Sequence, residues 1–209
     1  MNAPAPALGL TMSVEPQHAH EARSASALSG FWLFMMSDLI LFGLVFATYV
    51  TMLMPASFAL GPRPKAIFEL PGAALETAVL LTSTFTFAMA SLAIKYERGR
   101  REVVAWLLVT LALGLTFLSL EVSEFARMLE AGDRPQRSGF LSAFFGLVPL
   151  HGLHVLAGSV WLVLMLIEIA RSGLSDSVRS RLARLALFWH FLDLIWVGIF
   201  SVVYLGGRA

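Results

Sequence analysis

The chain has 209 residues, of which 57% are hydrophobic and 14% are charged, with a formal net charge of +1 and a mean hydropathy of +0.76. A soluble domain of this length carries about 25% charged residues, so the composition indicates a membrane protein. The near-neutral charge predicts no nucleic-acid partner. Because the sequence contains no cysteine, disulfides, iron–sulfur clusters and thiolate copper sites are excluded.

The first 27 residues, "MNAPAPALGLTMSVEPQHAHEARSASA", are rich in alanine and proline and lack the basic start and apolar run of a signal peptide. We expect residues 1–27 to form a flexible tail on the cytoplasmic side. His18 and His20 lie in this stretch, where histidines are usually solvated rather than metal-bound.

Five later stretches are long and apolar enough to cross a membrane, which takes about 20 residues. They cover about residues 28–54, 71–94, 103–120, 139–169 and 185–205. Helices are expected, because the lipid core cannot satisfy free backbone groups. The sequence therefore predicts an all-α, polytopic membrane protein whose residues 28–209 form one bundle of five transmembrane helices.

The basic residues between these stretches predict the orientation. With the amino terminus in the cytoplasm, nine basic residues lie inside: Arg23, Lys95, Arg98, Arg100, Arg101, Arg171, Arg179, Arg181 and Arg184. Six lie outside: Arg63, Lys65, Arg127, Arg134, Arg137 and Arg208. The excess on the first side favours a cytoplasmic amino terminus, and five spans then place the carboxyl terminus in the periplasm.

Six ionisable residues fall inside the predicted spans: Asp38, Glu76, His151, His154, His190 and Asp193. The fourth and fifth spans each hold a pair three residues apart, so each pair shares a helix face. One interpretation is a metal or haem site built by two helices, with an aspartate orienting a histidine. The other is hydrogen bonding between helices, which we favour because spacing alone is weak evidence.

The two acidic residues of the first and second spans also allow two interpretations. Asp38 and Glu76 could belong to a proton relay, or each could be a carboxyl hydrogen-bonded to a neighbouring helix or a lipid headgroup. The sequence has no ladder of acids on consecutive turns, so transport by this chain alone is not expected.

Small side chains recur every four residues along the second span. This stripe predicts a face on which another helix packs closely, and Glu76 points nearly the opposite way from the first stripe residue. We therefore expect the second span to be buried in the bundle or at a subunit contact. The stripe consists of Ala74, Ala78, Thr82, Thr86 and Ala90.

Four blocks of the sequence resemble subunit III of the haem–copper oxidases. They are "GFWLFMMSDLILFGLVFATY", "ELPGAALETAVLLTSTFTFAMA", "HGLHVLAGSVWL" and "LFWHFLDLIWVGIFSVVYL", in the family's order between Gly30 and Leu205. Within the family, the short chain with five spans is most similar to the form found in cytochrome bo ubiquinol oxidases. Asp38 stands where many members carry a glutamate, which is longer by one methylene.

The resemblance implies a non-catalytic accessory subunit of a proton-pumping ubiquinol oxidase, in the bacterial inner membrane, that stabilises and assembles subunit I. It implies no catalytic, cofactor-binding or metal-binding residue in this chain, with haem and copper in subunit I. The implied partners are subunit I, subunits II and IV, and phospholipids, with ubiquinol bound elsewhere in the complex. The six ionisable residues are then packing or hydrogen-bonding residues.

Three alternatives remain open at this point. Inside the family, the chain could belong to a cytochrome c oxidase or accompany a nitric oxide reductase. Outside it, the chain could be a stand-alone transporter or channel, although we detect no internal repeat of the kind common in transporters. It could also be an independent haem protein.

Overall fold

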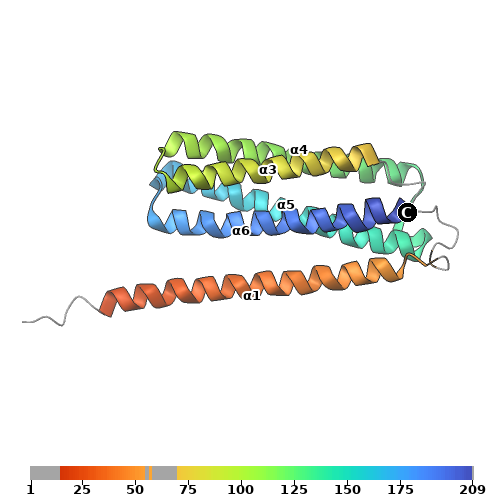
Figure 1. Ribbon diagram of the computed structural model, residues 1–209, viewed down its shortest axis with the longest axis horizontal. Helices are drawn as coiled ribbons and strands as arrows, with labels where there is room; N and C mark the ends of the chain where they lie inside the picture. The colour runs from red at the N-terminus through yellow and green to blue at the C-terminus, as the bar shows by residue number, and fades with distance from the viewer. Residues whose placement is uncertain (1–14, 55–56, 58–69, 209) are drawn as a thin grey trace, which may run out of the picture. The chain divides into compact units, whose positions relative to one another are not determined.

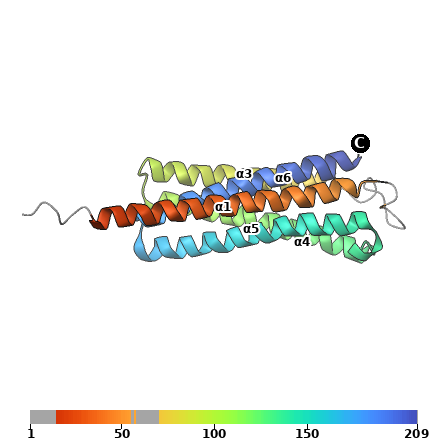
Figure 2. The same ribbon diagram turned by 90° about the horizontal axis from the view of Figure 1, so that it is seen from below.

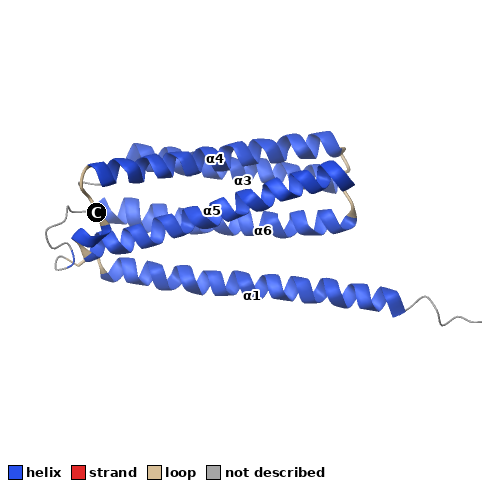
Figure 3. Ribbon diagram, turned by 180° about the vertical axis from the view of Figure 1, so that it is seen from behind, coloured by secondary structure: helices blue, strands red, loops and turns tan. Residues whose placement is uncertain are grey.

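The computed structural model describes residues 15–54, 57 and 70–208. The chain divides into two compact units, Met1–Leu41 and Phe42–Ala209. All regular elements of the described residues are helices, and no strand occurs among them (Figure 3). The all-α prediction is confirmed.

Helix α1 (Glu15–Thr51) begins upstream of the predicted span. Residues 15–27, which we expected to belong to a flexible tail, are helical, whereas residues 1–14 lie outside the described part of the chain. Two sequence features explain the early start. Pro16 fits the first turn of a helix, and the alanine, glutamate and arginine residues after it are good helix formers. The apolar part of α1 runs from Leu28 to Thr51.

The second unit contains α3 (Leu70–Lys95), α4 (Arg100–Glu130), α5 (Gly139–Ser172) and α6 (Asp176–Ile199). A π-helix, η3 (Phe200–Leu205), and a 3-10 turn, η4 (Gly206–Arg208), continue α6. With α1, the described residues contain five helices that are long and apolar enough to cross a membrane. The predicted number of spans is therefore confirmed, and the chain is a multi-pass membrane protein.

Local sequence signals fix the helix ends of the second unit. The hydroxyl oxygen of Ser138 accepts a hydrogen bond from the backbone N–H of Leu141 at 3.1 Å and caps the start of α5. Gly173 ends the same helix with φ at 71°, a conformation that favours glycine, and donates its N–H to the Ile169 carbonyl at 3.0 Å.

The four helices of the second unit form a closed ring in which α3 contacts α4, α4 contacts α5, α5 contacts α6, and α6 contacts α3 (Figures 1 and 2). Short turns join α3 to α4 and α5 to α6 at one end of the ring (Figure 1). Large buried side chains, among them Leu107, Phe117, Trp189 and Trp196, fill its interior.

Large apolar side chains also cover the outside of the second unit. They include Leu75, Phe85, Val122, Leu153, Leu164 and Leu194, which are 54–67% exposed. A soluble monomer rarely shows so much apolar surface. These helices therefore offer their outer faces to lipid or to other membrane helices.

Candidate functional site

The structure separates the predicted ionisable residues of the second unit. Glu76, His151 and Asp193 are buried in the bundle at 3%, 0% and 9% exposure. His154 is half-buried and His190 is exposed. Asp38 lies on α1 within the first unit. Three of the predicted ionisable residues thus lie in the interior of the second unit, and the two pairs that contain histidine are each split between a buried and a less buried member.

A cluster of carboxylates forms where α3 meets α4. Glu76 of α3 and Glu121 of α4 are both buried, at 3% and 4% exposure. Their carboxyl groups are close enough to each other and to Glu124 for mutual repulsion. Arg127, one turn further along α4, attracts Glu76. The cluster therefore extends from two buried carboxyl groups to the half-buried Glu124 and the exposed Arg127.

The cluster reaches two further elements. The hydroxyl of Tyr204, in η3, donates a hydrogen bond to Glu124 at 3.3 Å. On α5, Gly152 leaves the space that the Glu121 carboxylate occupies, since a Cβ at this position would lie 2.5 Å from both carboxylate oxygens. Glycine at position 152 is therefore required for Glu121 to rest against the α5 backbone.

An aromatic layer surrounds His151 next to this cluster. The ring centroid of His151 lies 5.2 Å from that of Trp196, 5.8 Å from that of Phe117 and 6.4 Å from that of Phe42. Neither ring nitrogen of His151 has a hydrogen-bond partner among the described residues. Edge contacts between aromatic rings are favourable at such separations, so His151 acts as part of the packed interior.

Two tryptophans of α6 donate hydrogen bonds to hydroxyl groups of α3. The indole N–H of Trp189 donates to Ser83, and that of Trp196 donates to Thr77, both at 3.1 Å. The two contacts lie about two turns apart along antiparallel helices. Hydrogen bonds of this kind between helices stabilise membrane bundles by about 1 kcal/mol each.

The predicted histidines do not converge on a common point. The Nδ1 atom of His154 lies 2.7 Å from the Leu150 carbonyl oxygen of its own helix, and His190 lies on the exposed side of α6. Within residues 15–54, 57 and 70–208, no group of three or more histidine, cysteine, aspartate or glutamate side chains could hold a metal ion. The side chains described here therefore supply no metal-binding group.

The small-residue stripe of α3 has two different environments. Thr86 and Ala90 are buried, and the Thr86 and Thr110 hydroxyls lie 2.8 Å apart between α3 and α4. Ala74, Ala78 and Thr82 are exposed. The reason is geometric: each step of four residues advances by about 40° around a helix, so the row drifts from an outer face to an inner one. Glu76 lies inside, away from exposed Ala74.

The third span was predicted to end near residue 120, before Glu121 and Glu124. In the structure α4 continues to Glu130. The missed signal was the spacing of the buried face, which includes Val103, Leu107, Thr110, Gly114, Phe117, Glu121 and Met128. From Val103 to Glu121, successive buried residues are three or four positions apart, so the buried face includes Glu121.

Comparison with known proteins identifies the family. The model of cytochrome c oxidase subunit III matches residues 11–208. A cytochrome bo(3) ubiquinol oxidase subunit 3 from Pseudomonas aeruginosa is 44% identical over 190 residues, which cover 91% of this chain and 89% of the relative. The Buchnera aphidicola protein of that name is 40% identical over 182 residues, or 87% and 92% of the two chains.

A more distant relative agrees. A probable quinol oxidase subunit 3 from Staphylococcus aureus is 38% identical over 180 residues, which cover 86% of this chain and 89% of the relative. The range that the family model matches includes the buried cluster and the aromatic layer. Since the family model also covers nearly the whole sequence, the chain belongs to the cytochrome c oxidase subunit III family.

Proposed function

We propose that this chain is subunit III of a ubiquinol oxidase, a non-catalytic accessory subunit that packs against subunit I, stabilises it and supports its assembly. The observation that carries the proposal is the 44% identity, over 91% of the chain, to a relative named as subunit 3 of a ubiquinol oxidase. The oxidation of ubiquinol and the reduction of oxygen then take place in the rest of the complex.

The side-chain chemistry supports an accessory role. His151 is enclosed by aromatic rings, His154 faces a carbonyl of its own helix, and His190 is exposed. Haem and copper would accordingly belong to subunit I. Subunits II and IV, phospholipids and ubiquinol bound elsewhere would complete the complex. The buried acids and histidines would serve packing and hydrogen bonding, as would Asp38 on α1.

We also propose a location in the bacterial inner membrane with residues 1–27 in the cytoplasm and the carboxyl terminus in the periplasm. The two turns at one end of the ring (Figure 1) support this orientation. They and their flanks carry Lys95, Arg98, Arg100, Arg101, Arg171, Arg179, Arg181 and Arg184. The other end carries Arg127, Arg134, Arg137 and Arg208. Basic residues accumulate on the cytoplasmic side of membrane proteins.

Deletion of this chain tests the function directly. We expect membranes from the deletion strain to contain less subunit I, with a weaker haem spectrum and a shorter turnover lifetime of ubiquinol oxidation, and a plasmid copy to restore all three. Unchanged subunit I content, turnover lifetime and proton pumping would refute the proposal. If the complex that contains this chain oxidises cytochrome c instead of ubiquinol, the chain belongs to the other branch of the family.

Replacing His190 by alanine should weaken the attachment of this subunit. His190 is exposed on α6, beside the buried Asp193, so its ring is available to a neighbouring subunit. We expect less of this chain to copurify with subunit I, while the haem spectrum per subunit I stays unchanged. Loss of the haem signal at full subunit I content would contradict the accessory role, because it would place His190 at a haem.

Replacing Thr82 by leucine tests whether the exposed half of the α3 stripe is a subunit contact. The side chain is exposed and its hydroxyl donates only to the Ala78 carbonyl of its own helix, at 2.7 Å. The larger side chain should leave the fold of the chain intact but reduce its copurification with subunit I. Leu81→Ala, at an exposed neighbouring position, is the control. Normal subunit stoichiometry in the Thr82→Leu complex would show that this face meets lipid.

A further inference from the structure

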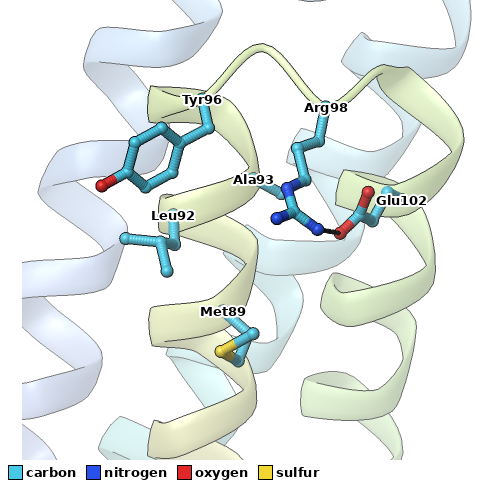
Figure 4. A pocket seen from close by; sticks show the side chains of 6 residues that line it. All are labelled: Met89, Leu92, Ala93, Tyr96, Arg98 and Glu102. Atoms are coloured by element: carbon cyan, nitrogen blue, oxygen red, sulfur yellow. Dashed lines mark ion pairs between the residues drawn. The ribbon is translucent and has the colours of Figure 1, made fainter.

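A small cavity opens where α3 turns into α4, apart from the buried cluster. Its volume is about 90 Å³, and it is lined by Met89, Leu92, Ala93, Tyr96, Arg98 and Glu102. Figure 4 shows Met89, Leu92 and Tyr96 along one side of α3, with Arg98 reaching from the turn toward Glu102. The lining thus combines an apolar wall with one cation and one anion.

The size of the cavity limits its ligand. Cavities that enclose drug-sized or quinone-sized molecules have volumes of about 300 Å³ or more. A space of about 90 Å³ admits about three water molecules or a group of similar bulk. It can therefore accept a phosphate or an ammonium group, but not a quinol ring with its tail.

The two charged residues are available to a ligand. A guanidinium nitrogen of Arg98 lies 3.7 Å from a carboxylate oxygen of Glu102, and their side chains are 65% and 37% exposed. Exposed ion pairs of this type contribute little to stability, so they open readily. Arg100, by contrast, is engaged in a hydrogen bond to the Ala170 carbonyl at 3.0 Å. Arg98 is consequently the cation of this turn that lines the cavity and can turn toward a ligand.

The apolar wall continues from the cavity toward the middle of the bundle. Leu81, Phe85, Leu92 and Tyr96 are 44–63% exposed and follow one another at intervals of four or seven residues along α3. From Leu81 to Tyr96 the helix rises about 22 Å. Half of a hydrocarbon core is about 15 Å thick, so this exposed row is long enough for one acyl chain.

We propose that the cavity binds a phospholipid with a primary ammonium headgroup, of the phosphatidylethanolamine type. The phosphate binds Arg98 and the unpaired N–H groups at the start of α4, whose Gly99 provides no side-chain cap. The ammonium group binds Glu102, and an acyl chain follows the exposed row of α3. The phosphate then lies beside Arg98 and the ammonium group beside Glu102, so each charge of the headgroup meets a side chain of opposite charge.

This assignment distinguishes three lipids with identical acyl chains. Phosphatidylglycerol offers the phosphate but no cation for Glu102. Phosphatidylcholine offers a cation that has no N–H to donate. Only phosphatidylethanolamine satisfies both residues with hydrogen bonds, and charge-assisted hydrogen bonds are the stronger kind. The dioleoyl form of each lipid is therefore a suitable probe.

The experiment measures binding of each dioleoyl lipid to the purified full-length chain in detergent by native mass spectrometry. We expect the wild-type chain to prefer phosphatidylethanolamine. Arg98→Gln should weaken that binding about tenfold, which corresponds to one charge-assisted hydrogen bond. Glu102→Gln should abolish the preference over phosphatidylglycerol.

Arg101→Gln is the matched control. Like Arg98→Gln it removes one positive charge, but Arg101 lies in the first turn of α4 and does not line the cavity. It should leave binding unchanged, and circular dichroism should show equal helix content in all variants. Equal binding of the three lipids, or equal weakening by Arg98→Gln and Arg101→Gln, would overturn the proposal in favour of nonspecific attraction by the basic turn. These outcomes are independent of the oxidase assays.

Discussion

Replacing Trp189 by alanine is expected to destabilise the full-length chain by about 3 kcal/mol, as loss of a buried aromatic side chain usually does. The indole is 1% exposed and joins α6 to all three other helices of the ring. Its N–H donates to Ser83 of α3. Its six-membered ring lies where side chains at Gly114 of α4 and Gly158 of α5 would be, 2.9 Å and 3.3 Å from the respective Cβ positions.

The cost of this substitution comes from packing rather than from transfer out of water, because lipid is as apolar as the core. Alanine would leave a cavity bordered by two glycines, and glycine has no side chain with which to fill it. The cavity and the lost contacts both remain in the folded state. The expected measurement is the free energy of unfolding in mixed micelles, or the melting temperature of the purified chain.

Two further variants separate the contributions of the indole. Trp189→Phe retains an aromatic ring but not the donor to Ser83, so a loss of about 1 kcal/mol is expected. Phe85→Ala removes an aromatic side chain that is 63% exposed on α3, and an exposed substitution should change stability by about 0.5 kcal/mol at most. If Trp189→Ala costs no more than Phe85→Ala, Trp189 does not link the ring.

Hydropathy predicted the number and approximate place of the helices, because membrane spans depend on a simple property of about 20 consecutive residues. It predicted the end of α4 less well. The segment "EVSEFARMLE" after the third apolar run is charged, so hydropathy ends the span there. The helix continues to Glu130 because its inner face keeps the same spacing. Hydropathy reports contact with lipid, whereas helix length also depends on neighbouring helices.

The interior was only partly predictable for a related reason. A sequence shows which residues share one helix face, but it does not show which faces meet. His190 and Asp193 have the same spacing as His151 and His154, yet His190 is exposed while His151 is fully buried. The contact between Glu121 and Gly152 joins two helices, so no spacing along one helix could have indicated it.

Replacing Gly152 by alanine is expected to destabilise the chain by about 2 kcal/mol, within the range for inserting a methyl group into a packed core. The new Cβ would lie 2.5 Å from both carboxylate oxygens of Glu121. A carboxylate at the end of a side chain can usually move aside. Here it is 4% exposed and rests against the α5 backbone, so little space remains for it to move into.

Gly146→Ala is the matched control on the same helix, since a Cβ at Gly146 meets nothing within 4 Å. This variant should be neutral or more stable by up to about 1 kcal/mol, because alanine favours helix more than glycine does. The opposite signs at two glycines of α5 would separate steric contact from helix propensity. Equal effects at both positions would mean that Glu121 does not rest against Gly152.

A double-mutant cycle with Glu121→Ala identifies the group that Gly152 accommodates. Once the carboxylate is removed, a methyl group at position 152 has space, so the double variant should lose less stability than the sum of the two single variants. For residues in direct contact we expect a coupling of about 1–2 kcal/mol. Additive losses would show that the Gly152→Ala strain arises from another neighbour. A positive coupling would establish that glycine in the "HGLHV" segment is needed because a buried acid of α4 occupies the space beside it.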